Sequence, residues 1–110
     1  MQILSPLKVK ADTWEEQVLQ VLLDKHCLSI LSMTKENAMT ASMICACCNI
    51  SISVAYRKLK LLKKLNLLRS TYTIQSDGKK SMSFQSKTIE INISLCENQL
   101  RIHTTFAPLE

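Results

Sequence analysis

Glycine and histidine are almost absent from this sequence, and their scarcity excludes several kinds of active site. The 110 residues include one glycine, Gly78, and two histidines. A loop that cradles phosphate with backbone amides needs several glycines, so no glycine-rich nucleotide site can be built. Histidine acid–base chemistry has almost no residues to draw on. We therefore expect a protein that is not an enzyme and that needs no cofactor.

Long apolar runs are also missing. The longest unbroken run, Met43–Cys48, has six residues, whereas a membrane-spanning helix needs roughly 20. The first ten residues lack the apolar centre of a signal peptide, so we expect a cytoplasmic protein with no membrane partner. Five cysteines, an odd number without paired spacing, fit reduced thiols in that compartment.

Acidic residues are scarce in the middle of the chain, so the net charge of +5 is spread unevenly. Residues 37–87 carry nine lysines and arginines against one acidic residue, Asp77, for a net charge of +8. Residues 1–36 and 88–110 carry net charges of −1 and −2. A strongly basic segment between weakly acidic ends predicts that a polyanion binds on one face.

Apolar residues recur at helical spacing before residue 66, and a capping residue precedes each helix. The pattern predicts helices over 14–23, from 25 to about 36, over 41–48 and over 52–65. The expected N-caps are Thr13, Asp24, Thr40 and Ser51. The first two helices can also form one continuous bent helix. Asn66 follows the last helix, where we expect a left-handed backbone conformation.

The period then changes to two, which is typical of strands. Leu68–Ile74 and Ser81–Ser86 flank Asp77-Gly78, a strong turn signal, and predict one β-hairpin. Thr88–Leu95 and Leu100–Phe106 alternate apolar and polar residues, and they predict a second hairpin with its loop at Cys96–Gln99. We expect three parts: an arm at 1–12, a domain at 13–87 and the second hairpin at 88–110.

The expected elements follow a characteristic order along the chain. A helix is followed by a short helix, a tight turn, a longer basic helix and a hairpin with a basic tip. Their residues are MTASMICACCNISISVAYRKLKLLKKLNLLR and the later turn SDGKK. They resemble the DNA-binding core of winged helix-turn-helix transcription regulators, most of all the short ArsR-like regulators of archaea. The resemblance implies an α+β fold, with a three-helix core after an N-terminal helix and a hairpin wing. It also implies that helix 52–65 enters the major groove of double-stranded DNA, while wing tip 76–80 contacts the backbone or minor groove.

A helical wheel divides the expected recognition helix into two faces. One face is apolar and should be buried; it holds Ala55, Leu59, Leu62 and Leu65. The opposite face and the wing tip supply the candidate DNA-binding residues, which are Ser53, Tyr56, Arg57, Lys60, Lys63, Lys64, Lys79 and Lys80. An arginine side chain can donate two hydrogen bonds to the edge of a guanine, and lysine side chains bind phosphates. These residues predict a sequence-specific DNA-binding transcription regulator.

Two other interpretations stay open. Cys45 and Cys48, on the helix before the recognition helix, and Cys27 on a neighbouring helix are candidate ligands for a thiol-based metal or redox sensor. Packing in the core without a metal is the commoner outcome for such cysteines. The same fold can also serve as a protein-interaction module whose basic face binds an acidic partner.

A regulator with one recognition helix usually binds DNA as a two-fold dimer, because two half-sites multiply weak contacts. We therefore expect a homodimer, joined by helix 14–23 or by hairpin 88–110. Both elements are apolar on one side, and either can instead pack on its own domain. The identity of any small-molecule or metal effector stays open.

Overall fold

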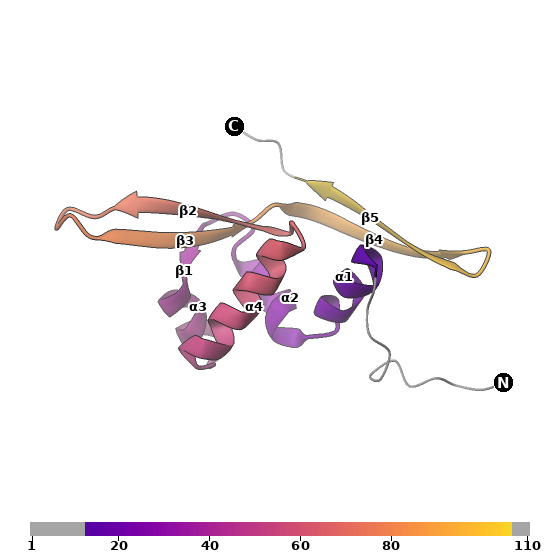
Figure 1. The fold of residues 1–110 in the computed structure, drawn as a ribbon, viewed down its shortest axis with the longest axis horizontal. Coiled ribbons are helices and arrows are strands. Elements are labelled where there is room, and N and C mark those ends of the chain that lie inside the picture. The colour runs from indigo at the N-terminus through magenta and orange to yellow at the C-terminus, as the bar shows by residue number, and fades with distance from the viewer. Residues whose placement is uncertain (1–12, 107–110) are drawn as a thin grey trace.

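The computed structural model describes residues 13–106, so the predicted arm at 1–12 and residues 107–110 lie outside the described part. The helices are α1 (Trp14–Leu22), α2 (Lys25–Met33), α3 (Ala41–Cys48) and α4 (Ile52–Lys64). The strands are β1 (Met39–Thr40), β2 (Leu68–Ile74), β3 (Lys80–Ser86), β4 (Thr88–Cys96) and β5 (Gln99–Phe106). Figure 1 shows the helices gathered along one side of two hairpins that point in opposite directions.

This arrangement of helices and antiparallel sheets confirms the α+β class and fits a winged helix. The order of strands in the first sheet is β1-β3-β2, and β4 and β5 form a separate two-stranded sheet. Among the described residues, no helix is long and apolar enough to cross a membrane. The proposed division between residues 87 and 88 stays a prediction.

All four expected N-caps accept hydrogen bonds from backbone amides one turn on. The Thr13 and Thr40 hydroxyls accept from the amides of Glu16 and Met43 at 3.1 and 3.3 Å. Ser51 accepts from the Val54 amide at 3.3 Å. Asp24 caps α2 in the same way, and a cap there breaks the chain into two helices. The alternative of one continuous bent helix is therefore wrong.

The structure differs from the sequence prediction at the end of α2 and in an additional strand. Helix α2 ends at Met33, before the expected end near residue 36, because the Thr34 carbonyl accepts a hydrogen bond from the Ser86 amide at 3.1 Å. Strand β1 was not predicted. It pairs Met39 with Phe84 in β3, and its two residues are too few to show any periodicity.

Residues in the left-handed backbone conformation lie in the turns. Asn66 has φ 66°, as expected for the residue that ends α4, and Gly78 has φ 84° in the turn between β2 and β3. The loop of the last hairpin is shorter than predicted, because β4 and β5 pair as far as Cys96 with Gln99. Only Glu97 and Asn98 remain in it, at φ 52° and 62°, which is the pattern of a type I′ turn.

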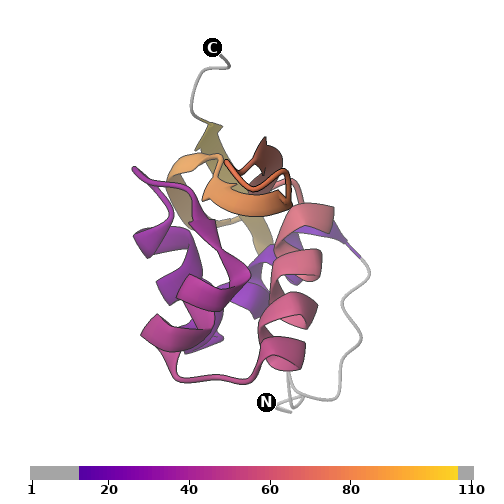
Figure 2. The same ribbon diagram turned by 90° about the vertical axis from the view of Figure 1, so that its left-hand side faces the viewer.

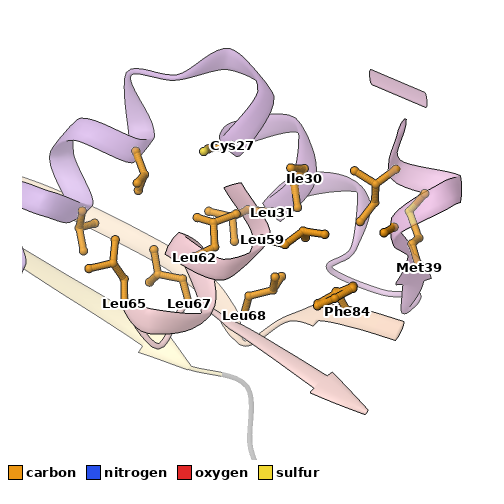
Figure 3. Close-up of a cluster of buried hydrophobic side chains, with 14 residues drawn as sticks. Cys27, Ile30, Leu31, Met39, Leu59, Leu62, Leu65, Leu67, Leu68 and Phe84 are labelled. Carbon is orange, nitrogen blue, oxygen red and sulfur yellow. The ribbon is translucent and has the colours of Figure 1, made fainter. Parts of the chain in front are cut away.

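The core lies between the helices and the sheet β1-β3-β2, and α4 supplies its centre (Figure 3). The predicted apolar face of α4 is buried at Ala55, Leu59, Leu62 and Leu65. Leu67 and Leu68 continue the buried path into β2, and Phe84 of β3 packs in the same cluster. The burial of α4 therefore fixes which of its faces remains outside.

We expect Leu62→Ala to lower the free energy of unfolding by about 3 kcal/mol, because Leu62 is fully buried and its loss leaves a cavity. The matched control is Leu61→Ala, one residue along on the exposed side of α4, with an expected loss below about 1 kcal/mol. Urea unfolding followed by circular dichroism measures both. Equal losses in the two variants would contradict the assigned orientation of α4.

Candidate nucleic-acid interface

Two polar contacts fix α4 to the first two helices. The Trp14 indole Nε1 donates to the Leu65 carbonyl oxygen at 2.9 Å, which joins the start of α1 to the C-terminal end of α4. The Lys58 ammonium forms an ion pair with the Asp24 carboxylate, which joins the middle of α4 to the start of α2. Both contacts lie beside the buried face, so they hold the helix without using its exposed face.

Asp24 combines two roles at the corner between α1 and α2. Its Oδ1 accepts from the amides of His26 and Cys27 at 2.8 and 3.2 Å, while Oδ2 accepts from Lys58. Burial alone would raise the pKa of Asp24. The hydrogen bonds from Lys58, Cys27 and His26 outweigh burial and lower the pKa below its ordinary value of 3.8. Asp24 therefore stays ionised and keeps Lys58 paired near neutral pH.

The outer face of α4 carries all six candidate residues predicted for this helix, and each is exposed: Ser53, Tyr56, Arg57, Lys60, Lys63 and Lys64. Within residues 13–106, none of the four cations in this set makes an ion pair or a side-chain hydrogen bond. Lys63 and Lys64 lie in the last turn, where the helix dipole favours positive charge. Figure 2 shows α4 beside α3, with the strands of the first hairpin above them. This face therefore presents unneutralised positive charge to solvent.

The hairpin β2–β3 places the other two candidates away from this face. Its turn is closed by bonds from the Gly78 amide to the Gln75 carbonyl at 2.9 Å and from the Gln75 amide to the Lys79 carbonyl at 2.8 Å. Asp77 accepts from the Lys79 amide at 3.0 Å, so the single acid of the basic segment shapes the turn. Lys79 and Lys80 are exposed at the tip, which extends beyond the helices (Figure 1).

Sequence reasoning missed two large side chains on this hairpin. Tyr72 and Ile74 are 65% and 74% exposed. They stand opposite Met82 and Lys80 in the ladder, on the face that carries the buried Phe84 nearer the core. The two-residue period of the strand places both side chains on one face of the sheet. Only the structure shows that this face extends beyond the helices and is left exposed there.

A groove of about 530 Å³ borders the exposed face of α4. It runs between α1, the start of α2 and α4. Val21 and Leu61 give it apolar walls, and Arg57 and Lys64 give it positive charge. Because the two cations belong to both surfaces, a molecule in this groove would occupy part of the outer face of α4.

The cysteines do not gather into a ligand set. Cys27 is buried in the core, and burial, with a smaller effect of the Asp24 charge, raises the pKa of its thiol to about 11. Cys45 and Cys48 are half-buried, and burial also raises the pKa of Cys48. Cys47 and Cys96 are exposed. Within the described range, no three His, Cys, Asp or Glu side chains lie together as a metal site. The structure therefore does not bring Cys27, Cys45 and Cys48 together as ligands.

Comparison with protein families supports the fold assignment. Residues 22–71 match a family described as a helix-turn-helix domain. The matched segment runs from the end of α1 into β2 and spans 50 of the 110 residues. No curated protein matches the chain. The likeness to a helix-turn-helix domain is therefore confined to residues 22–71, and within them α3 and α4 are two helices joined by the tight turn at Asn49.

We expect Asp24→Asn to lower the free energy of unfolding by about 1 kcal/mol at pH 7, because Asn caps a helix as well as Asp but cannot pair with Lys58. The folded state lowers the pKa of Asp24, so its stabilisation is present above the ordinary value of 3.8 and is lost as the pH falls through the folded value. The difference between the two proteins should therefore vanish in acid.

Urea unfolding from about pH 7 down to about pH 2.5 measures this difference. The control is Glu36→Gln, which removes an exposed carboxylate outside α2. A constant difference between wild type and Asp24→Asn at every pH would show that the ion pair does not contribute.

Proposed function

We propose that this protein is a sequence-specific regulator of transcription that binds double-stranded DNA, with α4 in the major groove. The observation that carries the proposal is the outer face of α4, where four cations on the second helix of a helix-turn-helix lack acidic partners within the described residues. The proposed activity is binding, without catalysis. We also propose that it is a regulator of the winged, ArsR-like kind.

The side chains of this face divide by chemistry into two groups. Arg57 presents a planar fork that fits the O6 and N7 atoms of guanine, and Ser53 and Tyr56 reach bases or phosphates from the start of the helix. Lys60, Lys63 and Lys64 lie further along, and an ammonium suits phosphate. Base recognition therefore depends on the first half of α4, and most of the affinity depends on the second half.

The distribution of charge also favours DNA over other partners. The basic segment, residues 37–87, has a net charge of +8, and it contains both α4 and the wing. An acidic protein surface offers fewer charges per unit length than duplex DNA, which carries one for about every 1.7 Å of its axis. The chain is proposed to act as a homodimer, because two copies of α4 can then contact two half-sites.

Charge reversal on α4 tests the proposal. We expect Lys60→Glu to weaken binding to duplex DNA at least about tenfold, because it replaces an attraction to phosphate with a repulsion. Lys35→Glu makes the same change of net charge at an exposed site after α2 and should weaken binding less than about twofold. Fluorescence anisotropy across a salt series measures both, with random and genomic duplexes compared.

Selective retention of a few genomic fragments supports a regulator that reads sequence. Equal effects of Lys60→Glu and Lys35→Glu would show that only net charge matters, and would refute the assigned interface. Absence of duplex binding by the wild type, together with capture of one acidic protein in equal amount, would favour the protein-interaction module.

The wing makes a separate contribution to binding. We expect Lys79→Ala with Lys80→Ala to weaken binding to all duplexes alike, and to reduce the slope of log affinity against log salt by about 2, because both side chains contact phosphates. The variant should keep the sequence preference of the wild type. An unchanged slope would show that the wing tip lies away from the DNA.

A further inference from the structure

The groove beside α4 has walls formed by two stripes of side chains. On each side the lining positions recur after three or four residues, which places them on one face of a helix. The first stripe, on α1 and the residue that caps α2, is Gln17, Gln20, Val21 and Asp24; the second, on α4, is Arg57, Lys58, Leu61 and Lys64. A ligand in the groove would therefore touch both helices at once.

Two contacts hold these walls in place. The Trp14 indole bonds to the Leu65 carbonyl at the C-terminal end of α4, and Asp24, just after α1, pairs with Lys58 nearer its start. Helix α1 therefore lies along α4 in the opposite direction, fixed at both ends. The volume of about 530 Å³ falls within the range of roughly 300 to 1,000 Å³ found for small-molecule sites. The groove is thus formed without a ligand, at a size that suits a small molecule.

The charge of the lining selects an anion. The described lining residues include three cations and one acid, for a net charge of +2. Arg57 and Lys64 have no ionic partner within residues 13–106. Both oxygens of Asp24 already accept hydrogen bonds, Oδ1 from two backbone amides and Oδ2 from Lys58. The groove therefore offers no unused carboxylate to a cation, while two cations are available to an anion.

Size and polarity narrow the choice of anion. A DNA duplex is too large to enter a space of this volume and can contact only its rim. Leu61 is 38% exposed and supplies an apolar wall that a bare inorganic ion would leave in water. Residues 1–12 contain two lysines and one aspartate, so the charge of this segment does not complement the groove. An organic anion with an apolar body matches both parts of the lining.

We propose that this groove binds a small organic anion in which an aromatic ring system carries one carboxylate. The Arg57 guanidinium can donate two parallel hydrogen bonds to a carboxylate, and such a pair is among the stronger polar contacts. Leu61 lies one turn along the same stripe and provides the surface for the ring. Lys64 adds positive charge at the far end of the stripe.

Binding in this groove also regulates the outer face of α4, a consequence that rests on the function proposed above. Arg57 is the side chain proposed to contact guanine, and one guanidinium cannot hold a carboxylate and a base edge together. The anion and DNA therefore exclude each other. The apparent affinity for DNA should fall as the concentration of the anion rises, and DNA should weaken the binding of the anion to the same extent.

Nuclear magnetic resonance titration of the reduced, isotope-labelled full chain tests the site. The probe is naphthoate, a two-ring aromatic carboxylate, added up to about 5 mM. The amide signals of Gln20, Val21 and Leu61 should shift and approach saturation. Naphthyl methanol has the ring without the charge, and acetate has the charge without the ring. Each should bind at least about tenfold more weakly than naphthoate.

Two variants of α4 form a matched pair for this titration. Arg57→Gln should weaken naphthoate binding at least about tenfold, because it removes the fork that holds the carboxylate. Lys60→Gln also removes one exposed, unpaired cation from α4, but Lys60 does not line the groove, so its effect should stay below about twofold. Equal effects of the two variants, shifts confined to amides outside the groove, or equal binding of acetate and naphthoate would overturn the inference.

Competition is measured by fluorescence anisotropy of duplex DNA. Naphthoate at about 5 mM should raise the dissociation constant of DNA at least about threefold more than acetate at the same concentration, which matches its ionic strength. Gln20→Glu places a negative charge on the α1 wall, away from the outer face of α4. This variant should keep its DNA affinity within about twofold and lose the effect of naphthoate, whereas Gln99→Glu, the same change at the tip of the last hairpin, should keep both.

The two proposals can fail separately, because the titration contains no DNA. Naphthoate binding by a protein that binds no duplex would refute the proposed function and leave the anion site in place. DNA binding without a naphthoate site would refute the inference alone. An unchanged DNA affinity while naphthoate occupies the groove would overturn the proposed regulation.

Discussion

The burial of one face of α4 is the constraint on which the rest of the structure depends. Leu59 and Leu62 lie at the centre of the core, so the helix cannot rotate without exposing them. The Trp14 and Asp24 contacts then fix its position along and across the first two helices. Because the core determines the orientation of the buried face, it also determines that Lys60 and Arg57 point to solvent. The surface proposed to bind DNA is thus a consequence of packing.

This surface has an electrostatic cost in the free protein. Four cations within two turns and no acidic partner within the described residues repel one another, which destabilises the isolated helix. Lys58 shows the alternative, because it is half-buried and paired with Asp24. The pairing of Lys58 and the exposure of Lys60 therefore separate a structural cation from one that remains available. A polyanion that neutralises the exposed set would stabilise the fold by mass action.

The sequence was sufficient to predict those structural features that depend on residues close together along the chain. Thr13, Asp24 and Ser51 marked the helix starts because capping is a local hydrogen bond. The wheel separated the buried from the exposed side of α4, because a helix of 13 residues shows its period clearly. Strand β1 could not be found in this way, since it exists only through pairing with β3, some 44 residues along the chain.

Contacts between distant segments account for the other gaps. Nothing in the sequence near Trp14 indicates that its indole reaches the Leu65 carbonyl, because the partner lies 51 residues away. The end of α2 depends in the same way on Ser86. The candidate site was predictable as a face of one helix, whereas its relation to the wing, to the groove and to the first two helices depends on tertiary structure.

The two hairpins show what an alternating strand pattern predicts and what it leaves to the tertiary structure. Both alternate apolar and polar residues, and both were predicted as hairpins. The first gains β1 as a third strand and buries Phe84 among the helices, so its base belongs to the core. The second has two strands and lies against α1, so Leu95 remains in solvent. A pattern that specifies an apolar face does not specify what covers it. Where the chain itself supplies no cover, part of the apolar face stays in contact with water, and the hydrophobic free energy that folds the first hairpin is not gained there.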